Sequence, residues 1–277
     1  MKKIDTKDAE KIEKKSRRIE EKASCEFLGE LTYTDLEELL AQDRPCIAIL
    51  PVGSTEAHGP HLPLATDSII SEGMAQRGGE ALCERGINAV ILPTIHYAVT
   101  EWARDFRGST SIGESTAHDL VLETTRAARA IGFTRVAMVS AHLEPGHIAV
   151  LRQVARRYAE ELGEPLVFPD KTRRRNAAKL SPEFQSGSCH AGQYETSLML
   201  ALRPKLVRQE IAATLPKKQV DLVRHIQAGA SGFIDCGMEH AYCGAPAAAS
   251  AAEGEASLRA LATMLVEAVR ASLGQLE

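Results

Sequence analysis

Short apolar runs alternate with longer amphipathic stretches along this chain from about residue 27 onward. Runs of this length that stop at a proline or a polar loop are typical of buried strands. Their residues are apolar at consecutive positions, as expected where helices cover both faces of a sheet. The predicted strands cover residues 46–50, 89–92, 135–139 and 165–168.

The stretches between these runs carry helix signals. Thr34 to Glu37 reads as a capping box at the start of a short helix, and Gly132 follows the stretch 114–131 as a helix-ending residue. Strands that alternate with helices of this length favour βαβ units. We therefore expect an α/β fold, a mostly parallel central sheet covered by helices on each side. The longer predicted helices cover residues 67–85, 114–131, 146–162, 192–202 and 253–273.

Residues 1–24 differ from the rest, with nine Lys or Arg and six Asp or Glu and little that is apolar. Pairs such as Glu10 with Lys14 support a helix. We expect a solvated N-terminal extension, in preference to an arm that binds a partner subunit. Residues 25–277 are then expected to form a single domain.

Composition excludes several classes of function. The formal net charge of −4 argues against nucleic-acid binding, which needs a basic surface. No apolar run approaches the roughly 18 residues of a membrane helix, and the N-terminus carries no secretory signal pattern. The six cysteines form no CxxC pair and read as reduced thiols, so we expect a cytoplasmic protein.

Two loops that follow predicted strands are dense in histidine and carboxylate. Glu56 and His58 follow the strand 46–50, and His142 and Glu144 follow the strand 135–139. The carboxyl ends of parallel strands share one edge of a sheet, so these loops can converge. Asp67, at the start of a helix, adds a third carboxylate.

These residue types are the nitrogen and oxygen ligands that suit zinc or manganese. Two carboxylate–histidine pairs and one further aspartate match a two-metal site, in which ions about 3.5–4 Å apart activate a shared water. Asp67 alone would more often be a helix cap. It is the joint pattern that favours a metal centre.

A third cluster runs from Cys189 to Ser197. His190 is placed to act as a general acid or base, and Glu195 could be a further ligand or an orienting partner. A Cys189–His190 nucleophile pair is disfavoured, because adjacent side chains usually point apart.

Several segments together resemble the creatininase (creatinine amidohydrolase) family. The stretch from Pro51 to Pro63, followed by Asp67, is similar to the long signature of that family. The segment 106–111, the pair His142 and Glu144, and the segment 190–197 match further family motifs in the same order. The resemblance covers about residues 27–270 and leaves residues 1–24 outside.

The resemblance implies a three-layer α/β/α fold, a binuclear zinc or manganese centre and a hexamer. It implies that Glu56, Asp67 and His142 hold one ion. It implies that His58, Asp67 and Glu144 hold the other, with Asp67 bridging.

The same resemblance makes His190 the proton-transfer residue. Many members carry glycine where Glu144 stands and rely on the carboxylate that matches Glu195. Both carboxylates are present here, so either can complete the second metal site. Glu144 is also a candidate catalytic residue.

Departures from creatininase argue against creatinine as the substrate. Creatininase walls its substrate with tryptophans just before the His-Ala-Gly segment, whereas the only tryptophan here, Trp102, lies well upstream. Trp102 and Tyr194 are the candidate substrate contacts. The stretch 170–176 is basic, and its Arg173–Arg175 run fits an exposed loop or a subunit contact better than an anion site.

The expected function is a metal-dependent amidohydrolase that cleaves a cyclic amide or a formamide-type C–N bond of a small molecule. The alternatives are a hydrolase of a cyclic ketone, a peptidase that matures a peptide, and a metal- or ligand-binding member without turnover. We expect a homo-oligomer that binds neither nucleic acid nor membrane.

Overall fold

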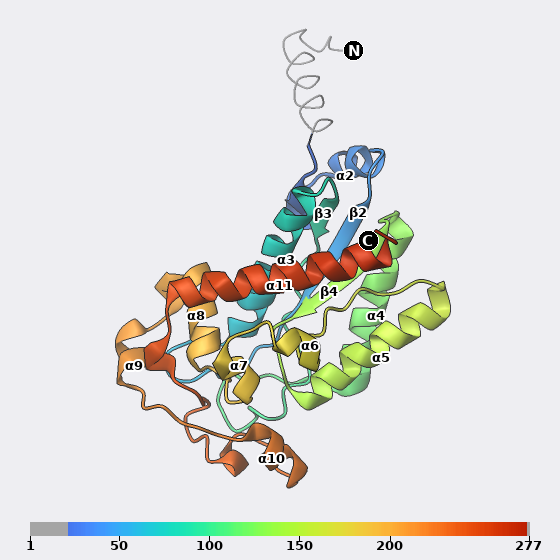
Figure 1. Cartoon of the computed structure of the whole chain (residues 1–277). Helices are drawn as coiled ribbons and strands as arrows, with labels where there is room; N and C mark the ends of the chain where they lie inside the picture. Colours follow the sequence, from blue (N-terminus) through green and yellow to red (C-terminus); the bar gives the residue numbers. More distant parts are fainter. Residues whose placement is uncertain (1–21, 276–277) are drawn as a thin grey trace, which may run out of the picture.

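The structure, a computed structural model, describes residues 22–275. At its centre is a four-stranded parallel sheet with the strand order β1-β3-β2-β4 (Figure 1). Ile49 of β2 lies opposite Ile91 of β3 on one side and Ala137 of β4 on the other. The strands are β1 (Cys25–Phe27), β2 (Cys46–Val52), β3 (Asn88–Ile91) and β4 (Arg135–Ser140).

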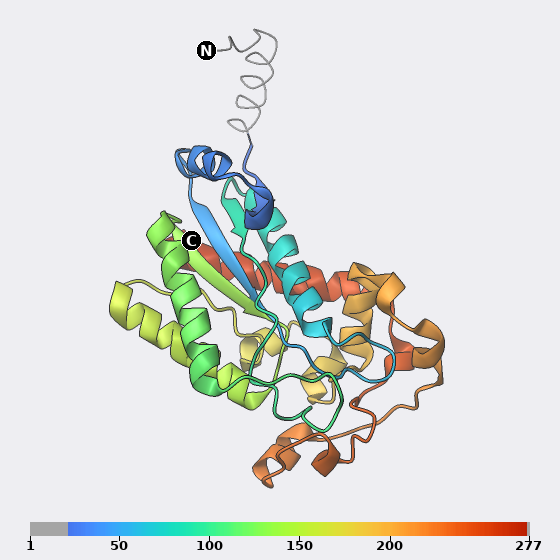
Figure 2. The same ribbon diagram turned by 180° about the vertical axis from the view of Figure 1, so that it is seen from behind.

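Helices cover both faces of this sheet. One face packs against α3 (Thr66–Cys83), and α8 (Gln193–Leu202) and α11 (Ala251–Ser272) pack against α3 in turn. The other face carries α4 (Glu114–Ile131) and α5 (Pro145–Leu162), which lie side by side in Figure 2. The predicted α/β/α architecture is confirmed.

Shorter elements connect these layers, and the lower part of Figure 1 holds α10 beyond the carboxyl ends of the strands. No helix among residues 22–275 is both long and apolar enough to cross a lipid bilayer. The remaining helices are α2 (Tyr33–Leu40), α6 (Arg174–Ala177), α7 (Pro182–Ser186), α9 (Gln209–Thr214) and α10 (Leu222–Gln227), with short 3-10 turns at Leu28–Glu30, Pro204–Leu206, Ile234–Cys236 and Pro246–Ala248.

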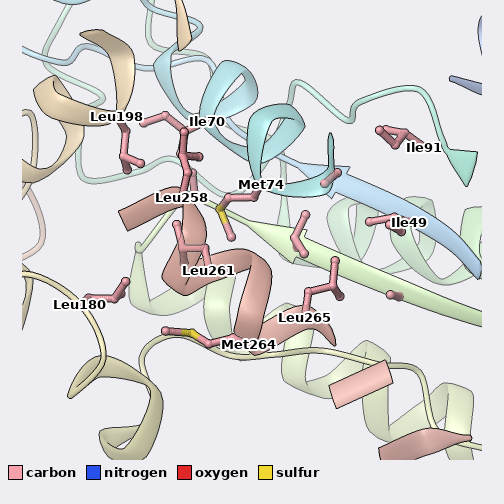
Figure 3. Close-up of a cluster of buried hydrophobic side chains, with 14 of the residues drawn as sticks. Ile49, Ile70, Met74, Ile91, Leu180, Leu198, Leu258, Leu261, Met264 and Leu265 are labelled. Carbon is pink, nitrogen blue, oxygen red and sulfur yellow. The ribbon is translucent and has the colours of Figure 1, made fainter. Parts of the chain in front are cut away.

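The apolar residues of β2 alternate between two cores. Ile47 and Ile49 pack with the layer of α3, α8 and α11, whereas Ala48 and Leu50 pack with α4 and α5. Side chains alternate across a strand, so a strand that is buried on both faces must be apolar at every position. Figure 3 shows the first of these cores, with side chains of α3, α8 and α11 directed toward one another.

Glycines in α3 serve its packing. A Cβ at Gly78 would lie 2.4 Å from Leu265 of α11, so a side chain there would push the two helices apart. The sequence pattern correctly predicts a helix here. The glycines that weaken its intrinsic propensity allow α11 to approach closely.

Three local predictions needed correction. The cap of α2 is Thr32 with Asp35, not Thr34 with Glu37. The predicted strand 165–168 is wrong: only Val167 forms a single bridge, to Ala137. Proline at 165 and 169 leaves few backbone N–H groups for a ladder. Strand β1 was not predicted, because three residues are too few to show a pattern. The predicted extension over residues 1–24 lies almost wholly outside the described residues.

Candidate metal centre

Four separate segments bring acidic and histidine side chains together at the carboxyl edge of the sheet. The loop after β2 contributes Glu56 and His58, the first turn of α3 contributes Asp67, and the loop after β4 contributes His142. The first turn of α8 contributes Glu195. Each of these five residues is at most 3% exposed, so they form a buried polar cluster.

Gly53 lets the loop after β2 reach this cluster. A Cβ at Gly53 would lie 2.4 Å from the Cα of Ser68, so the loop could not pass the start of α3 with any other residue. The Ser54 hydroxyl then donates to Asp67 Oδ2 over 2.7 Å. This bond fixes the orientation of the aspartate.

The ring of His142 is oriented for ligation by its Nδ1. Its Nε2 lies 2.8 Å from the carbonyl oxygen of Val99, which can only accept, so Nε2 carries the proton. Nδ1 lies 3.1 Å from Glu56 Oε1 and 3.0 Å from Asp67 Oδ2. A backbone acceptor that fixes the tautomer in this way is usual for a metal-binding histidine.

His58 is oriented in the same way, but for ligation by its Nε2. Its Nδ1 lies 3.2 Å from the carbonyl oxygen of Glu56, which can only accept, so Nδ1 keeps its proton and Nε2 is the nitrogen that can bind a metal ion once it is deprotonated. Nε2 lies 3.5 Å from Asp67 Oδ1 and 3.6 Å from Glu195 Oε2. The two oxygens of Asp67 therefore face different histidines, the arrangement of a bridging carboxylate.

Burial and charge shift the pKa values of these groups strongly. Burial lowers the pKa of His58, but the carboxylates of Asp67, Glu195 and Glu56 raise it to about 10. Burial also lowers the pKa of His142, but Glu56 and Asp67 raise it well above the usual range. Each ring thus sits where a positive charge is stabilised.

Three atoms of the cluster are buried without a hydrogen-bond partner in residues 22–275: Glu56 Oε2, His58 Nε2 and Asp67 Oδ1. Buried charged groups without partners are costly unless they coordinate a cation. Three sets of ligand atoms lie within 4.8 Å of one another: Glu56, Asp67 and His142; His58, Asp67 and Glu195; and Glu56, His58 and His190. The donor set therefore fits divalent metal ions.

Glu144 and Glu195, the two candidates for one ligand position, are placed differently. Glu195 Oε2 faces His58 and accepts the N–H of Ala191 over 2.7 Å. The Glu144 carboxylate instead accepts the N–H groups of Glu101 and Trp102, each over 3.1 Å. Among the described residues, Glu144 belongs to none of the sets whose ligand atoms lie close enough together to share an ion.

His190 lies beside the cluster, close to Glu56 and His58. Its Nε2 donates to the carbonyl oxygen of Ala57 over 3.0 Å, and its ring lies 4.5 Å from that of His58. Burial, and the charge of His58, lower the pKa of His190 well below its usual value. The ring is therefore neutral, and its Nδ1 can accept a proton.

A cavity of about 340 Å³ opens over these groups. Trp102, one of the two candidate substrate contacts, lines this cavity. Tyr194 does not: its side chain is fully buried and packs on Phe184 at 4.9 Å between ring centroids. Neighbouring residues on a helix point in directions about 100° apart, and on α8 it is Glu195 that is directed toward the cluster.

The basic stretch 170–176 divides into exposed and buried parts. Arg173 and Arg175 are exposed and line a separate hollow together with Arg152. Lys171, however, is buried, and its Nζ donates to the carbonyl oxygen of Ala141 over 2.8 Å. It thereby supports the residue next to His142. The sequence did not predict this role, because Lys171 stands in a run of charged residues.

Sequence patterns also missed Phe233 and Leu222, which line the cavity. They lie in a segment without strand or long-helix periodicity, so no local signal connects them with the metal ligands. Cys189 lines the cavity too, but burial raises the pKa of its thiol well above the usual value. A neutral thiol is a poor nucleophile.

The family model of creatininase, described as creatinine amidohydrolase, matches residues 29–269. The chain belongs to the creatininase family. A mycofactocin precursor peptide peptidase of Mycobacterium tuberculosis (strain CDC 1551 / Oshkosh) is 31% identical over 230 residues, which are 80% of this chain and 82% of the relative. A creatinine amidohydrolase of Pseudomonas putida is 28% identical over 205 residues, 65% of this chain and 73% of the relative.

Solved structures of creatininases share the fold. A crystal structure of creatinine amidohydrolase (creatininase) superimposes with a TM-score of 0.68 at 24% identity and covers 88% of this chain and 96% of its own. Two further creatininase structures, one named a Zn-Zn type and one a Mn form, have TM-scores of 0.67 and 0.65 at 23% identity. Each covers 88% of this chain and 97% of its own.

Proposed function

We propose that this creatininase-family chain is a metal-dependent hydrolase that cleaves an amide-type C–N bond of a small molecule. The observation that carries the proposal is the buried cluster of three carboxylates and two histidines, three of whose polar atoms have no hydrogen-bond partner in residues 22–275. Divalent ions would supply the missing partners. Creatininase structures of zinc and manganese forms support these two metals.

Glu56, Asp67 and His142 would hold one ion, and His58, Asp67 and Glu195 would hold the other, since Asp67 belongs to both sets. Such ions lower the pKa of a bound water toward neutrality and polarise a carbonyl oxygen. The protein's own residues make two contributions. Backbone groups orient the metal-binding side chains, and the apolar walls of the cavity exclude bulk water from the reaction.

His190 is the proposed proton-transfer residue. Its neutral ring accepts the proton of the attacking water and then delivers it to the leaving nitrogen. The bond from Nε2 to the Ala57 carbonyl oxygen leaves Nδ1 for this task. An amide nitrogen leaves readily only after protonation, so this delivery is what makes C–N cleavage efficient.

A peptidase that acts on a precursor peptide is the second candidate. It is favoured by the relatives named mycofactocin precursor peptide peptidase, which are as much as 32% identical to this chain. The chemistry at the metal centre would be the same, since a peptide bond is also an amide. A hydrolase of a cyclic ketone and a binding protein without turnover are the further alternatives, and a substrate panel separates them.

The test begins with the metal content of the purified protein, measured by plasma mass spectrometry. We expect about two zinc or manganese ions per chain, lost in Asp67→Ala. Asp119→Ala, which removes an exposed carboxylate of α4, is the matched control and should keep both ions. A protein that binds no transition metal, even after zinc or manganese is added, contradicts the proposal.

Activity is then measured on formamides, lactams, creatinine, short peptides and cyclic ketones. Hydrolysis of an amide, lowered about 10²- to 10⁴-fold in His190→Ala with both ions retained, supports the proposal. Full turnover in His190→Ala contradicts the role of His190. Cleavage restricted to peptides selects the second candidate, and cleavage restricted to ketones rejects both.

A further inference from the structure

The cavity over the metal ligands has apolar walls. Leu143, Phe184 and Leu222 line it together with the aromatic rings of Trp102 and Phe233. Its volume of about 340 Å³ is near the lower end of the range for small-molecule sites. This space suits the reacting amide and one attached group of modest size.

The aromatic wall adjoins the proposed proton-transfer residue. The ring of Phe233 lies 4.2 Å from that of His190 and 6.1 Å from that of Trp102, in an edge arrangement with Trp102. The N–H of Phe233 also donates to the carbonyl oxygen of Trp102 over 2.9 Å. Two segments that lie far apart in the sequence are thus joined into one wall beside the reaction site.

Glu144 holds this wall in place. Its carboxylate accepts the N–H groups of Glu101 and Trp102, which ties the Trp102 segment to the start of α5. Trp102 therefore has backbone anchors on two sides, Glu144 at its N–H and Phe233 at its carbonyl. A wall fixed in this way can discriminate between substrates.

Charge also restricts what the cavity accepts. No lysine or arginine is among its described lining residues, and its charged groups other than histidine are carboxylates. Arg173 and Arg175 line a different hollow. A negatively charged group on the substrate would find no cationic side chain here and would lie close to Glu144.

We infer that the amide substrate carries an uncharged apolar group, of aryl or branched-alkyl type, that packs against the wall formed by Trp102 and Phe233 beside His190. The inference rests on the proposed hydrolase function, because the metal centre is what anchors the amide. It adds the class of substrate: neutral, with an apolar group next to the scissile bond. Burial of such a group favours binding in proportion to the apolar area removed from water.

The experiment uses hydroxamates, which bind metal ions and position a variable group in the cavity. Acetohydroxamate, phenylacetohydroxamate and its 4-carboxy derivative are titrated calorimetrically into the zinc-loaded protein. We expect the phenyl group to tighten binding about 10- to 100-fold over methyl, and the added carboxylate to cancel most of that gain. Equal affinities, or a preference for the carboxylate, would overturn the inference.

Substitutions in the cavity wall test which residues cause the preference for phenyl over methyl. Trp102→Ala should remove most of the preference for phenyl over methyl, whereas Tyr97→Ala, which removes an aromatic residue that is 51% exposed and outside the cavity, should keep it. Phe233→Leu keeps an apolar residue, so it gives a second test should the alanine variant fold poorly. An unchanged preference in both Trp102→Ala and Phe233→Leu contradicts the inference.

The outcomes distinguish this inference from the proposed function. If the hydroxamates follow the expected order but no amide is hydrolysed, the hydrolase proposal fails and the pocket assignment stands. If amides are hydrolysed without regard to the attached group, the function stands and this inference fails. If the protein binds no metal ion, both fail together.

Discussion

At the scale of single residues, metal binding depends on how each ligand side chain is oriented by the groups around it. Glu56, His58 and Asp67 stand in one long motif, and the structure brings them together as expected. Which nitrogen of a histidine is free depends on a backbone carbonyl that no motif contains. For His142 this carbonyl belongs to Val99, 43 residues away.

The choice between Glu144 and Glu195 gives the first prediction. Glu195→Gln should lose about one of the two ions, because Oε2 of Glu195 faces His58 Nε2 at 3.6 Å. Glu144→Gln should keep both, because the Glu144 carboxylate is occupied by two backbone N–H groups. Metal content measured by plasma mass spectrometry decides between them. The reverse pattern would show that Glu144 is the ligand.

Metal binding should release protons, which is the second prediction. In the metal-free protein the carboxylates around His58 raise its pKa to about 10 despite its burial, so its ring is protonated at pH 8. Ligation requires the neutral ring. His142, whose pKa is also raised, should lose a proton in the same way. Metal binding should then release about two protons per chain in total.

Zinc titrations by calorimetry in buffers of different ionisation enthalpy count these protons. The affinity for zinc should weaken as the pH falls. The stability of the metal-free fold changes with pH in the opposite direction. Its His58 pKa exceeds the ordinary 6.5, so the ring stabilises the fold fully below pH 6.5 and loses this effect as the pH rises through about 10. A zinc affinity independent of pH would contradict this assignment.

At the scale of elements, the hydrophobic periodicity of the sequence is sufficient to predict an element that is long. The helix predicted over 114–131 matches α4 at both ends. Short elements depend on partners elsewhere in the chain: β1 exists because its three residues pair with β3. The failed strand at 165–168 shows the converse, since an apolar run between prolines makes only one bridge.

The attachment of α8 gives the third prediction. Glu183 of α7 accepts the N–H of Tyr194 over 2.8 Å and that of Ala245 over 2.7 Å, so one carboxylate joins the start of α8 to a distant loop. Glu183→Ala leaves both donors without this partner. We expect the free energy of unfolding to fall by about 2–4 kcal/mol, measured by urea denaturation.

The matched control is Glu84→Ala, which removes a carboxylate that is 77% exposed and lies 3.8 Å from the guanidinium of Arg85. Exposed ion pairs contribute little, so this variant should change the unfolding free energy by less than about 1 kcal/mol. Similar losses in Glu183→Ala and Glu84→Ala would mean that the Glu183 carboxylate does not hold α8.

At the scale of the whole molecule, the parallel sheet explains why distant motifs converge. Loops after β2 and β4 leave the same edge, so Glu56 and His142, 86 residues apart in the sequence, can share a site. The cavity wall could not be foreseen, because Phe233 and Leu222 follow no pattern that connects them with the sheet. The hexamer implied by the family resemblance stays a prediction.

Because the ligands come from four segments, metal ions should stabilise the entire fold. Each ion that binds only the folded chain adds about 2.7 kcal/mol when free metal is at 100 times its dissociation constant, so two ions add about 5.4 kcal/mol. For a chain of this size, that corresponds to about 10–20 °C in the unfolding midpoint. A strong chelator should therefore lower the midpoint by this amount in the wild-type protein. It should leave Asp67→Ala unchanged, since that variant lacks the shared ligand. A wild-type midpoint that ignores the chelator, while metal is shown to be removed, would mean that the four segments are held together by protein contacts alone.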